Sequence, residues 1–157
     1  MTYGKNYFLL SKNHFAIPLL EENLKKIEWG YLSFNPGAMN LLQNNLSKIV
    51  WSQLCKNPHL EAIQLLRKNM IQINWWSLNN NPNGHLILRN YPDKIIWSLF
   101  CSYSNDLTLC YENLDKVDWF YLSTRPEAIH VLEKNLDKIN LKSITWNKNA
   151  GHIIRNN

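Results

Sequence analysis

Tryptophan returns along this chain at nearly constant intervals, always beside apolar neighbours and with polar residues between the repeats. Trp29, Trp51, Trp75, Trp97 and Trp119 are separated by steps of 22, 24, 22 and 22 residues. A further step of 22 reaches Leu141, and a step back reaches Tyr7. A fixed period of this length predicts a repeat architecture that runs through the whole chain.

Further columns of the repeat keep their residue type relative to the Trp position. Two residues before it stand Ile27, Ile49, Ile73, Ile95, Val117 and Ile139. Three residues after it stand Leu32, Leu54, Leu78, Phe100, Leu122 and Ile144. Nine residues before it stand Leu20, Leu42, Leu66, Leu88, Cys110 and Leu132. These matched columns predict the core positions of six similar units.

Each unit begins with a pattern that starts a helix. Asn-Pro pairs occur at Asn35, Asn57 and Asn81, and Arg125-Pro126 replaces the pair in the last full unit. Asn is a good N-cap, and Pro suits the first helical position because its φ angle is already helical. Apolar residues one turn apart then follow, as in residues 128–132, so we expect a short first helix with one buried face.

An Asn column is expected to end that first helix. It comprises Asn23, Asn45, Asn69, Asn113 and Asn135, with Tyr91 in the remaining unit. Asn tolerates the left-handed conformation found past many helix ends, and the next hydrophobe, such as Leu136, can pack back on the last turn. The following segment, for example residues 115–123 with Asp115 or Asp118 as cap, is predicted to form a second short helix antiparallel to the first.

Units of this kind cannot bury their apolar faces alone, so they must stack. The predicted fold is all-α, an α-solenoid of short antiparallel two-helix repeats. It comprises a half-unit at 7–13, six units over about 14–147 and a half-unit at 148–155, within a single domain at 1–157. Some helix starts are less certain because the chain departs from the pattern there. Two extra residues precede Ala62, and Ser104, Asp106 and Leu141 replace the usual Pro, Ala and Trp.

A leucine-rich-repeat horseshoe is the alternative fold, because it also uses units of just over twenty residues. The stretch from Leu24 through Ile27 to Trp29 resembles its strand motif. The position that should hold the ladder Asn of that motif is Leu32, however, and it is apolar in the other units too. We therefore favour the α-solenoid.

The unit resembles a tandem repeat that is abundant in large DNA viruses of the mimivirus-like kind. That repeat runs close to Leu-Ser-x-Asn-Pro-x-Ala-Ile-x-Leu-Leu-x-x-Asn-x-x-Lys-Ile-x-Trp, and residues 32–51 follow it from Leu32-Ser33 to Trp51. The similarity covers about residues 7–155. It implies a viral origin and, by analogy with ankyrin arrays in similar viruses, contact with other proteins. It supplies no catalytic residues.

Composition and charge indicate the class of protein and the compartment in which it is expected. The chain has 157 residues, 45% apolar and 18% charged, with a net charge of +5, which indicates one folded and mildly basic domain rather than a disordered tail. No apolar run is long enough for a signal peptide or a membrane span, so we expect an unsecreted protein of the host cytoplasm, nucleus or virion. Cys55, Cys101 and Cys110 form no metal-ligand or disulfide pattern and are expected to be buried, reduced thiols.

Aromatic residues in variable columns are the candidate partner-binding set. The two positions after each Trp vary between units, and variable columns of repeat arrays usually face solvent and carry specificity. We predict an exposed aromatic strip for a protein partner, formed by Tyr31, Trp76, Phe120 and Tyr121. The alternative is that these side chains complete the core, which is the role we expect for the Trp column itself.

A basic column lies three residues before Trp and holds Lys26, Lys48, Lys94, Lys116 and Lys138. A ladder of ammonium groups along one edge of a stack could follow the phosphates of a nucleic acid. Asp93, Asp115 and Asp137 each directly precede one of these lysines and would repel phosphates. We therefore favour a solvated face.

Residue patterns of catalysis and metal binding are missing from the sequence. It contains no Gly-rich phosphate loop, nucleophile elbow or His-Glu-x-x-His motif, so we expect no enzyme activity and no cofactor. His130 and His152 share a column and could stack, but nearby residues lack ligand spacing, so no metal is expected. His85 falls in an apolar column and is expected to be partly buried and hydrogen-bonded.

The sequence therefore predicts a non-enzymatic protein–protein interaction module that engages a host or viral protein. The first alternative is a nucleic-acid-binding protein that uses the basic column and the exposed aromatics. The second is a structural virion component that self-associates end to end through apolar residues of the terminal half-units, such as Ile153 and Ile154. We expect a monomer or a weak end-to-end oligomer.

Overall fold

The computed structural model describes residues 6–156, and these residues are all-helical, without a strand. The ends of the predicted domain, residues 1–5 and 157, lie outside the described residues. The α-helices are α1 (Tyr7–Lys12), α2 (Ile17–Glu21), α3 (Trp29–Phe34), α4 (Met39–Gln43), α5 (Trp51–Leu54), α6 (Leu60–Lys68), α7 (Trp75–Asn79), α8 (His85–Leu88), α9 (Trp97–Tyr103), α10 (Thr108–Glu112), α11 (Trp119–Thr124), α12 (Ile129–Leu132) and α13 (Gly151–Asn156).

Short 3₁₀-helices connect these α-helices. They are η1 (His14–Ala16), η2 (Leu24–Lys26), η3 (Pro36–Ala38), η4 (Leu46–Lys48), η5 (Met70–Gln72), η6 (Pro92–Lys94), η7 (Pro126–Ala128), η8 (Leu136–Lys138) and η9 (Ile144–Trp146). The predicted second helix of a unit therefore has two parts. In the unit of Trp29, η2 comes first, Ile27 and Glu28 are non-helical, and α3 begins at the Trp position. A continuous second helix was the wrong prediction, because two residues with ψ near 130° and 86° interrupt it.

The Asn-Pro start is confirmed at Asn35, with a 3₁₀ first turn, whereas after Asn57 and Asn81 the Pro lies outside the helix, and α6 and α8 begin later. The side-chain oxygen of Asn35 accepts a hydrogen bond from the Gly37 N–H at 3.0 Å, and η3 leads directly into α4. Asn57 accepts from His59 in the same way, and Asn81 accepts from Asn83. Each Asn side chain thereby satisfies an N–H group that lacks an intrahelical partner.

The Asn column ends the first helix by a different mechanism from the one expected. Asn45 has φ −136° and ψ 48°, and no residue among 6–156 has a positive φ. Its side-chain N–H instead donates to the Leu41 carbonyl at 2.8 Å, and the other Asn residues of the column make the same bond four residues back. The left-handed ending was therefore wrong, since a hydrogen bond from the side chain already pairs the last carbonyls. Leu136, expected to pack back on the last turn, is half exposed.

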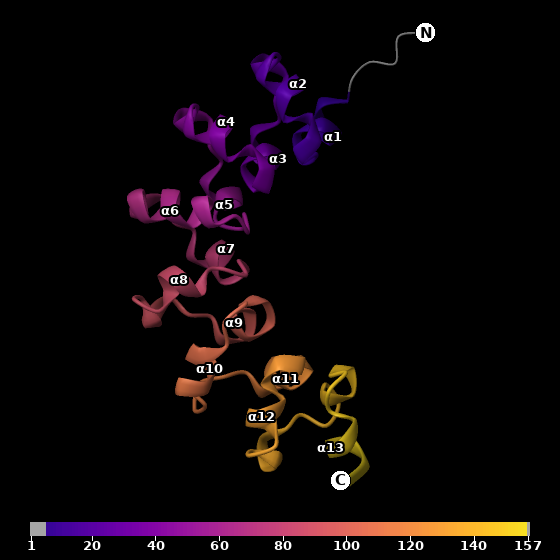
Figure 1. Ribbon diagram of the computed structural model, residues 1–157. Helices are drawn as coiled ribbons and strands as arrows, with labels where there is room; N and C mark the ends of the chain where they lie inside the picture. The colour runs from indigo at the N-terminus through magenta and orange to yellow at the C-terminus, as the bar shows by residue number, and fades with distance from the viewer. Residues whose placement is uncertain (1–5, 157) are drawn as a thin grey trace.

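The units follow one another along an open arc (Figure 1). The helices that begin at the Trp position, α1, α3, α5, α7, α9 and α11, line the inner side of the arc, and we call them the inner helices. The outer helices α2, α4, α6, α8, α10 and α12 form the opposite row. Along the inner row α3 contacts both α1 and α5, and α11 contacts α9 and η9. The horseshoe alternative is wrong, because its strand motif falls on η2, two non-helical residues and the start of α3.

The predicted apolar columns form a continuous core between the two rows. The column three residues after Trp is at most 2% exposed in each of its members, from Leu32 to Ile144. The column nine residues before Trp is completely buried in each of its members, from Leu20 to Leu132. The Trp side chains are half-buried and pack against this core, so they cover its edge rather than fill its centre.

A polar column four residues after Trp joins each inner helix to the next. The Ser33 hydroxyl donates to the Trp29 carbonyl at 2.7 Å and accepts from the Val50 N–H at 3.0 Å. Ser11 and Ser123 accept the corresponding N–H groups of the next unit, and Asn79 does so with its amide oxygen. Each of these side chains thus fixes where the following inner helix begins.

Buried Asn side chains make a second connection between units. The side-chain N–H groups of Asn57 donate to the carbonyls of Ser33 and Asn35, at 3.0 and 3.1 Å. Asn81 makes the same pair of bonds to Cys55 and Asn57. Asn147 does so at the other end of the arc, to Ser123 and Arg125. We call this set of buried amides the Asn ladder.

Ser104 interrupts the Asn ladder, and Arg125 takes the place of an Asn in the following unit. The Ser104 hydroxyl bonds only within its own turn, to Asp106. The Arg125 guanidinium reaches back to three carbonyls of the preceding unit, those of Cys101, Ser102 and Ser104, at 2.9, 3.2 and 2.9 Å. Arg125 therefore makes in its own unit the kind of connection that Asn57, Asn81 and Asn147 make in theirs. No buried side-chain nitrogen or oxygen of the described residues lacks a partner.

We predict that Asn57→Ala lowers the free energy of unfolding by about 2–4 kcal/mol, since it leaves the Ser33 carbonyl without this donor and the Asn35 carbonyl with only the Ala38 N–H. Asn44→Ala is the matched control, because Asn44 is exposed, and it should change stability by less than about 0.5 kcal/mol. Urea denaturation followed by circular dichroism measures both. Equal stabilities of the two variants would show that the Asn ladder does not hold the units together.

Candidate functional site

Exposed aromatic side chains gather on the inner row. Nine aromatic residues of the described chain are exposed, and seven of them belong to inner helices or to η9, which continues the inner row after α11. These seven are Phe8, Tyr31, Phe34, Trp76, Tyr103, Tyr121 and Trp146. Phe15 and Tyr91 are the two that lie elsewhere. We call the exposed side of the inner helices and η9 the inner surface.

The four aromatic residues proposed from the sequence lie on this surface, in three separate helices. Trp76 on α7 is 56% exposed, and Tyr31 on α3 and Tyr121 on α11 are about 40% exposed. Phe120 is half-buried and lies edge-on to Tyr121, with ring centres 5.1 Å apart. Phe120 also lies edge-on to Trp146 at 6.2 Å, so this end of the arc carries a three-ring cluster.

Several residues of the inner surface were missed from the sequence. Phe34 and Trp146 stand five residues after the Trp position, in a column that also holds Lys12, Lys56, Asn80 and Thr124. Val50 and Ile96, both exposed, stand one residue before it. These columns vary between units as much as the two that were considered. The same variability would have identified them.

Two lysines outside the predicted basic column lie against these rings. The Lys12 ammonium is 4.2 Å from the centre of the Phe8 ring and 4.4 Å from the centre of the Tyr31 ring. The Lys56 ammonium is 5.3 Å from the Trp76 ring. Cations at this distance are attracted to the electron-rich face of the ring. The inner surface therefore combines aromatic area with positive charge.

The predicted basic column is exposed throughout, but it lies in the 3₁₀ turns. Lys94 pairs with Asp93 at 2.8 Å, and this hydrogen bond lowers the pKa of the Asp93 carboxyl. Lys116 donates to the Asn113 amide oxygen, and Lys138 lies over the Trp119 ring. Among residues 6–156, only one of these five lysines pairs with a carboxylate. Two of the five lie over aromatic rings, those of Tyr7 and Trp119, and neither ring belongs to the four proposed aromatic residues.

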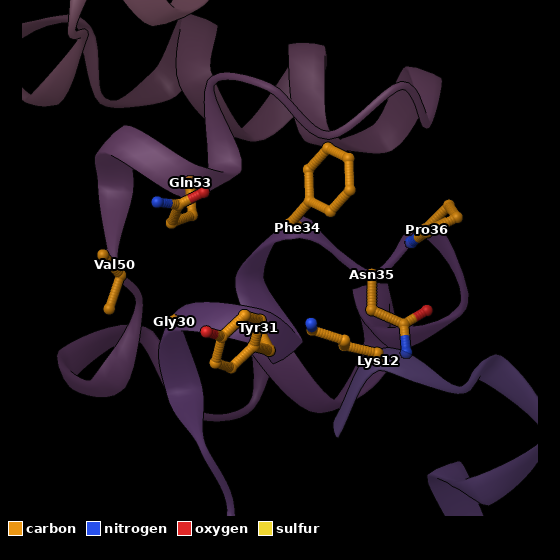
Figure 2. A pocket seen from close by; sticks show the side chains of 8 residues that line it. All are labelled: Lys12, Gly30, Tyr31, Phe34, Asn35, Pro36, Val50 and Gln53. Carbon is orange, nitrogen blue, oxygen red and sulfur yellow. The ribbon is translucent and has the colours of Figure 1, made fainter. Parts of the chain in front are cut away.

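A pocket of about 660 Å³ opens on the inner surface beside α1, α3 and α5 (Figure 2). Tyr31, Phe34 and Val50 supply most of its apolar lining, and Lys12 and Gln53 lie at its edge. No carboxylate is among the residues that line it.

The histidines contact other groups instead of each other. The His130 ring lies edge-on to Tyr111 at 4.9 Å, and His152 bonds to the Glu133 carboxylate at 2.7 Å. His85 is half-buried, as predicted, and its Nδ1 lies 3.2 Å from the Pro82 carbonyl. Within the described part of the chain, no three His, Cys, Asp or Glu side chains come together as metal ligands.

The three cysteines are buried free thiols, as predicted. The sulfurs of Cys101 and Cys110 are 3.4 Å apart, within hydrogen-bond distance. This bond, followed by burial, raises the pKa of Cys110, which acts as the donor. Burial also raises the pKa of Cys55 to about 11, although the Asn74 N–H opposes the effect. The bond with Cys110 lowers the pKa of Cys101, but all three sulfurs are buried and have no access to solvent.

Comparison with known protein families, with curated proteins and with solved structures gives no match to this chain. Between residues 6 and 156, no helix has the length and apolar character needed to cross a membrane.

We predict that Cys55 makes stability depend on pH in the alkaline range. Its pKa is about 11 when folded and about 9 when exposed, so the folded chain keeps a proton that the unfolded chain loses. This difference in pKa stabilises the folded chain by about 2–3 kcal/mol. The stabilisation is fully present below about pH 9 and is lost as the pH rises through about 11. Denaturation of the parent and of Cys55→Ala should therefore show a stability difference that shrinks over this range. A constant difference would contradict the prediction.

Proposed function

We propose that the chain is an α-solenoid and that it works as a non-enzymatic protein-binding module through its inner surface. Two sets of hydrogen bonds that join successive units support the solenoid assignment: those of the column four residues after Trp and those of the Asn ladder. The order of the helices along the arc of Figure 1 agrees with it. Stacked units of this kind present extended concave surfaces, which repeat proteins commonly use for binding.

One observation carries the functional proposal. Seven of the nine exposed aromatic side chains among residues 6–156 lie on the inner surface, although the outer helices and turns offer as many positions. Aromatic side chains supply large contact areas at low entropy cost and are enriched at the energetic centres of protein interfaces. Exposed rings with no structural role in the core cost solubility, so their concentration on one side is best explained by a partner that covers them.

The biological setting follows from the resemblance to repeats of large DNA viruses. We propose a viral protein that acts inside the host cell, in the cytoplasm or nucleus, and binds a host or viral protein. The Trp residues that define the repeat serve the stack in this proposal, and the variable columns around them determine the partner.

We predict that Trp76→Ala combined with Phe120→Ala abolishes capture of the partner from host-cell lysate, because it removes one ring from each half of the inner surface. The matched control is Phe15→Ala combined with Ile71→Ala, which removes side chains that are 83% and 94% exposed and lie outside the inner row. Affinity capture with quantitative mass spectrometry compares both with the parent, and thermal unfolding shows that each is folded. Equal capture of the partner by the two double variants would show that the inner surface is not the binding site.

A nucleic-acid-binding function is the second candidate, because four lysines of the basic column have no carboxylate partner in the described chain. The same capture experiment separates it when half of the lysate is treated with nuclease. Loss of capture after nuclease treatment, with affinity falling log-linearly with salt, would favour the basic column.

Self-association is the third candidate, and the C-terminal end supports it. Leu141 is 70% exposed and Ile154 is 44% exposed, and together with Ile144 they line a hollow of about 200 Å³. Light scattering at increasing protein concentration tests this candidate, and a constant monomer mass would count against it.

A further inference from the structure

The pocket beside α1, α3 and α5 has a glycine, Gly30, in its lining. Gly30 stands one residue after the Trp position, where the other units have Ser52, Trp76, Ser98, Phe120 and Lys142. A Cβ atom built on Gly30 would meet no other atom within 4 Å. The conformation of Gly30 does not require glycine either, because no glycine in the described chain has a positive φ. Neither backbone geometry nor close packing therefore accounts for glycine here, and a side chain at this position would take up space in the pocket that Gly30 lines.

The walls of the pocket are suited to a bulky apolar side chain. Tyr31, Phe34 and Val50 line it and are exposed by 40%, 48% and 38%. The volume of about 660 Å³ is within the usual range for pockets that hold one compact ligand group. Figure 2 shows Gly30 between the Val50 side chain and the Tyr31 ring, with the Phe34 ring further away across the pocket.

The polar groups of the pocket are cationic or neutral. Asn35 also lines it, but its amide is already bonded to the Ser11 carbonyl and the Gly37 N–H. The Lys12 ammonium lies between two rings and pairs with no carboxylate in the described chain. A carboxylate that approaches beside Tyr31 would therefore meet an uncompensated cation, and the Gln53 amide, elsewhere in the lining, can also donate a hydrogen bond.

We infer that this pocket is the anchor site for an extended segment of a partner protein, in which a bulky apolar side chain stands next to Asp or Glu. The apolar side chain fills the space above Gly30, and the neighbouring carboxylate binds the Lys12 ammonium. The inference rests on the proposed function of the inner surface and names the chemistry of the partner at one end of it. Lys56 against Trp76, two units further along the inner row, repeats the combination of cation and ring, so an acidic segment that continues along the arc meets a second site of the same charge.

Peptides of defined sequence test the inference directly. The first probe is acetyl-Gly-Asp-Trp-Asp-Gly-amide, and the second has Asn in place of both Asp. Titration of each into ¹⁵N-labelled protein, up to about 5 mM, detects dissociation constants in the millimolar range through amide shifts. We expect the acidic peptide to shift the amides of residues 30–36 and 50–53 and to bind at least about threefold more tightly than the neutral one.

Two variants separate the two parts of the site. Gly30→Leu places a side chain in the part of the pocket that the apolar anchor would occupy, and it should weaken binding of the acidic peptide by about tenfold or more. Ser98→Leu is its matched control, since it adds the same side chain at the same column of a distant unit, and it should leave binding unchanged. Lys12→Gln should leave the shifted residues the same but remove the preference for the acidic peptide. Unfolding temperatures close to that of the parent establish that the variants are folded.

Several results would overturn the inference. They are shifts absent or scattered outside the pocket, equal binding of the two peptides to the parent, and unchanged binding by Gly30→Leu. Shifts of the same amides on dilution of the protein alone would assign the pocket to a second copy of the chain instead. If the Trp76→Ala and Phe120→Ala double variant loses a captured partner but Gly30→Leu keeps it, the inner surface is the binding site and the proposed anchor pocket is not part of it.

Discussion

The structure depends on how very short helices satisfy their backbone hydrogen bonds. The α-helices of the described chain have between four and nine residues. Four N–H groups at the start of a helix and four carbonyls at its end have no intrahelical partner, so in helices this short most of the backbone is terminal. Buried polar groups without partners cost free energy, so another part of the chain must supply the missing donors and acceptors.

Side chains at fixed positions of the repeat supply them, and the partners are often in the next unit. Ser33 accepts from Val50, and Asn57 donates to two carbonyls of the preceding unit. Hydrogen bonds that cross between units fix their spacing, which apolar contacts alone would leave loose because they have no direction. Arg125 bonds three carbonyls of the preceding unit where other units use Asn, so more than one residue type can make this connection. The exposed positions of the inner helices are left free to vary, and these positions carry the aromatic rings.

The core and the order of the units could be predicted from the sequence, because burial recurs with the period of the repeat. The helix ends could not. Asn45 was expected to adopt a left-handed conformation, but whether an Asn does so depends on whether its side chain can bond four residues back. The break at Ile27 and Glu28 was missed because a 3₁₀ turn and an α-helix place apolar residues at similar spacings over so short a segment.

The candidate site was predictable only in part, for a related reason. Tyr31 and Trp76 were placed on the surface because their columns vary, and the structure exposes both. Phe34 and Lys12 could be assigned to the site only from the structure. A residue five positions after Trp contacts a ring of the neighbouring unit only when the units are stacked. Gly30 stands in a variable column, but a residue without a side chain gave no reason to name it as part of a site.

The most direct test of this account is small-angle X-ray scattering of the protein in solution, because the account requires that the units stack in one open arc. A compact domain of 157 residues has a radius of gyration of about 15 Å. Six inner helices and η9 in a row, at about 8–10 Å per step, give a particle about 50–60 Å long before side chains are added. We predict a radius of gyration clearly above the compact value and an asymmetric distance distribution that extends beyond this length. A value near 15 Å with a symmetric distribution would show that the units do not form the arc.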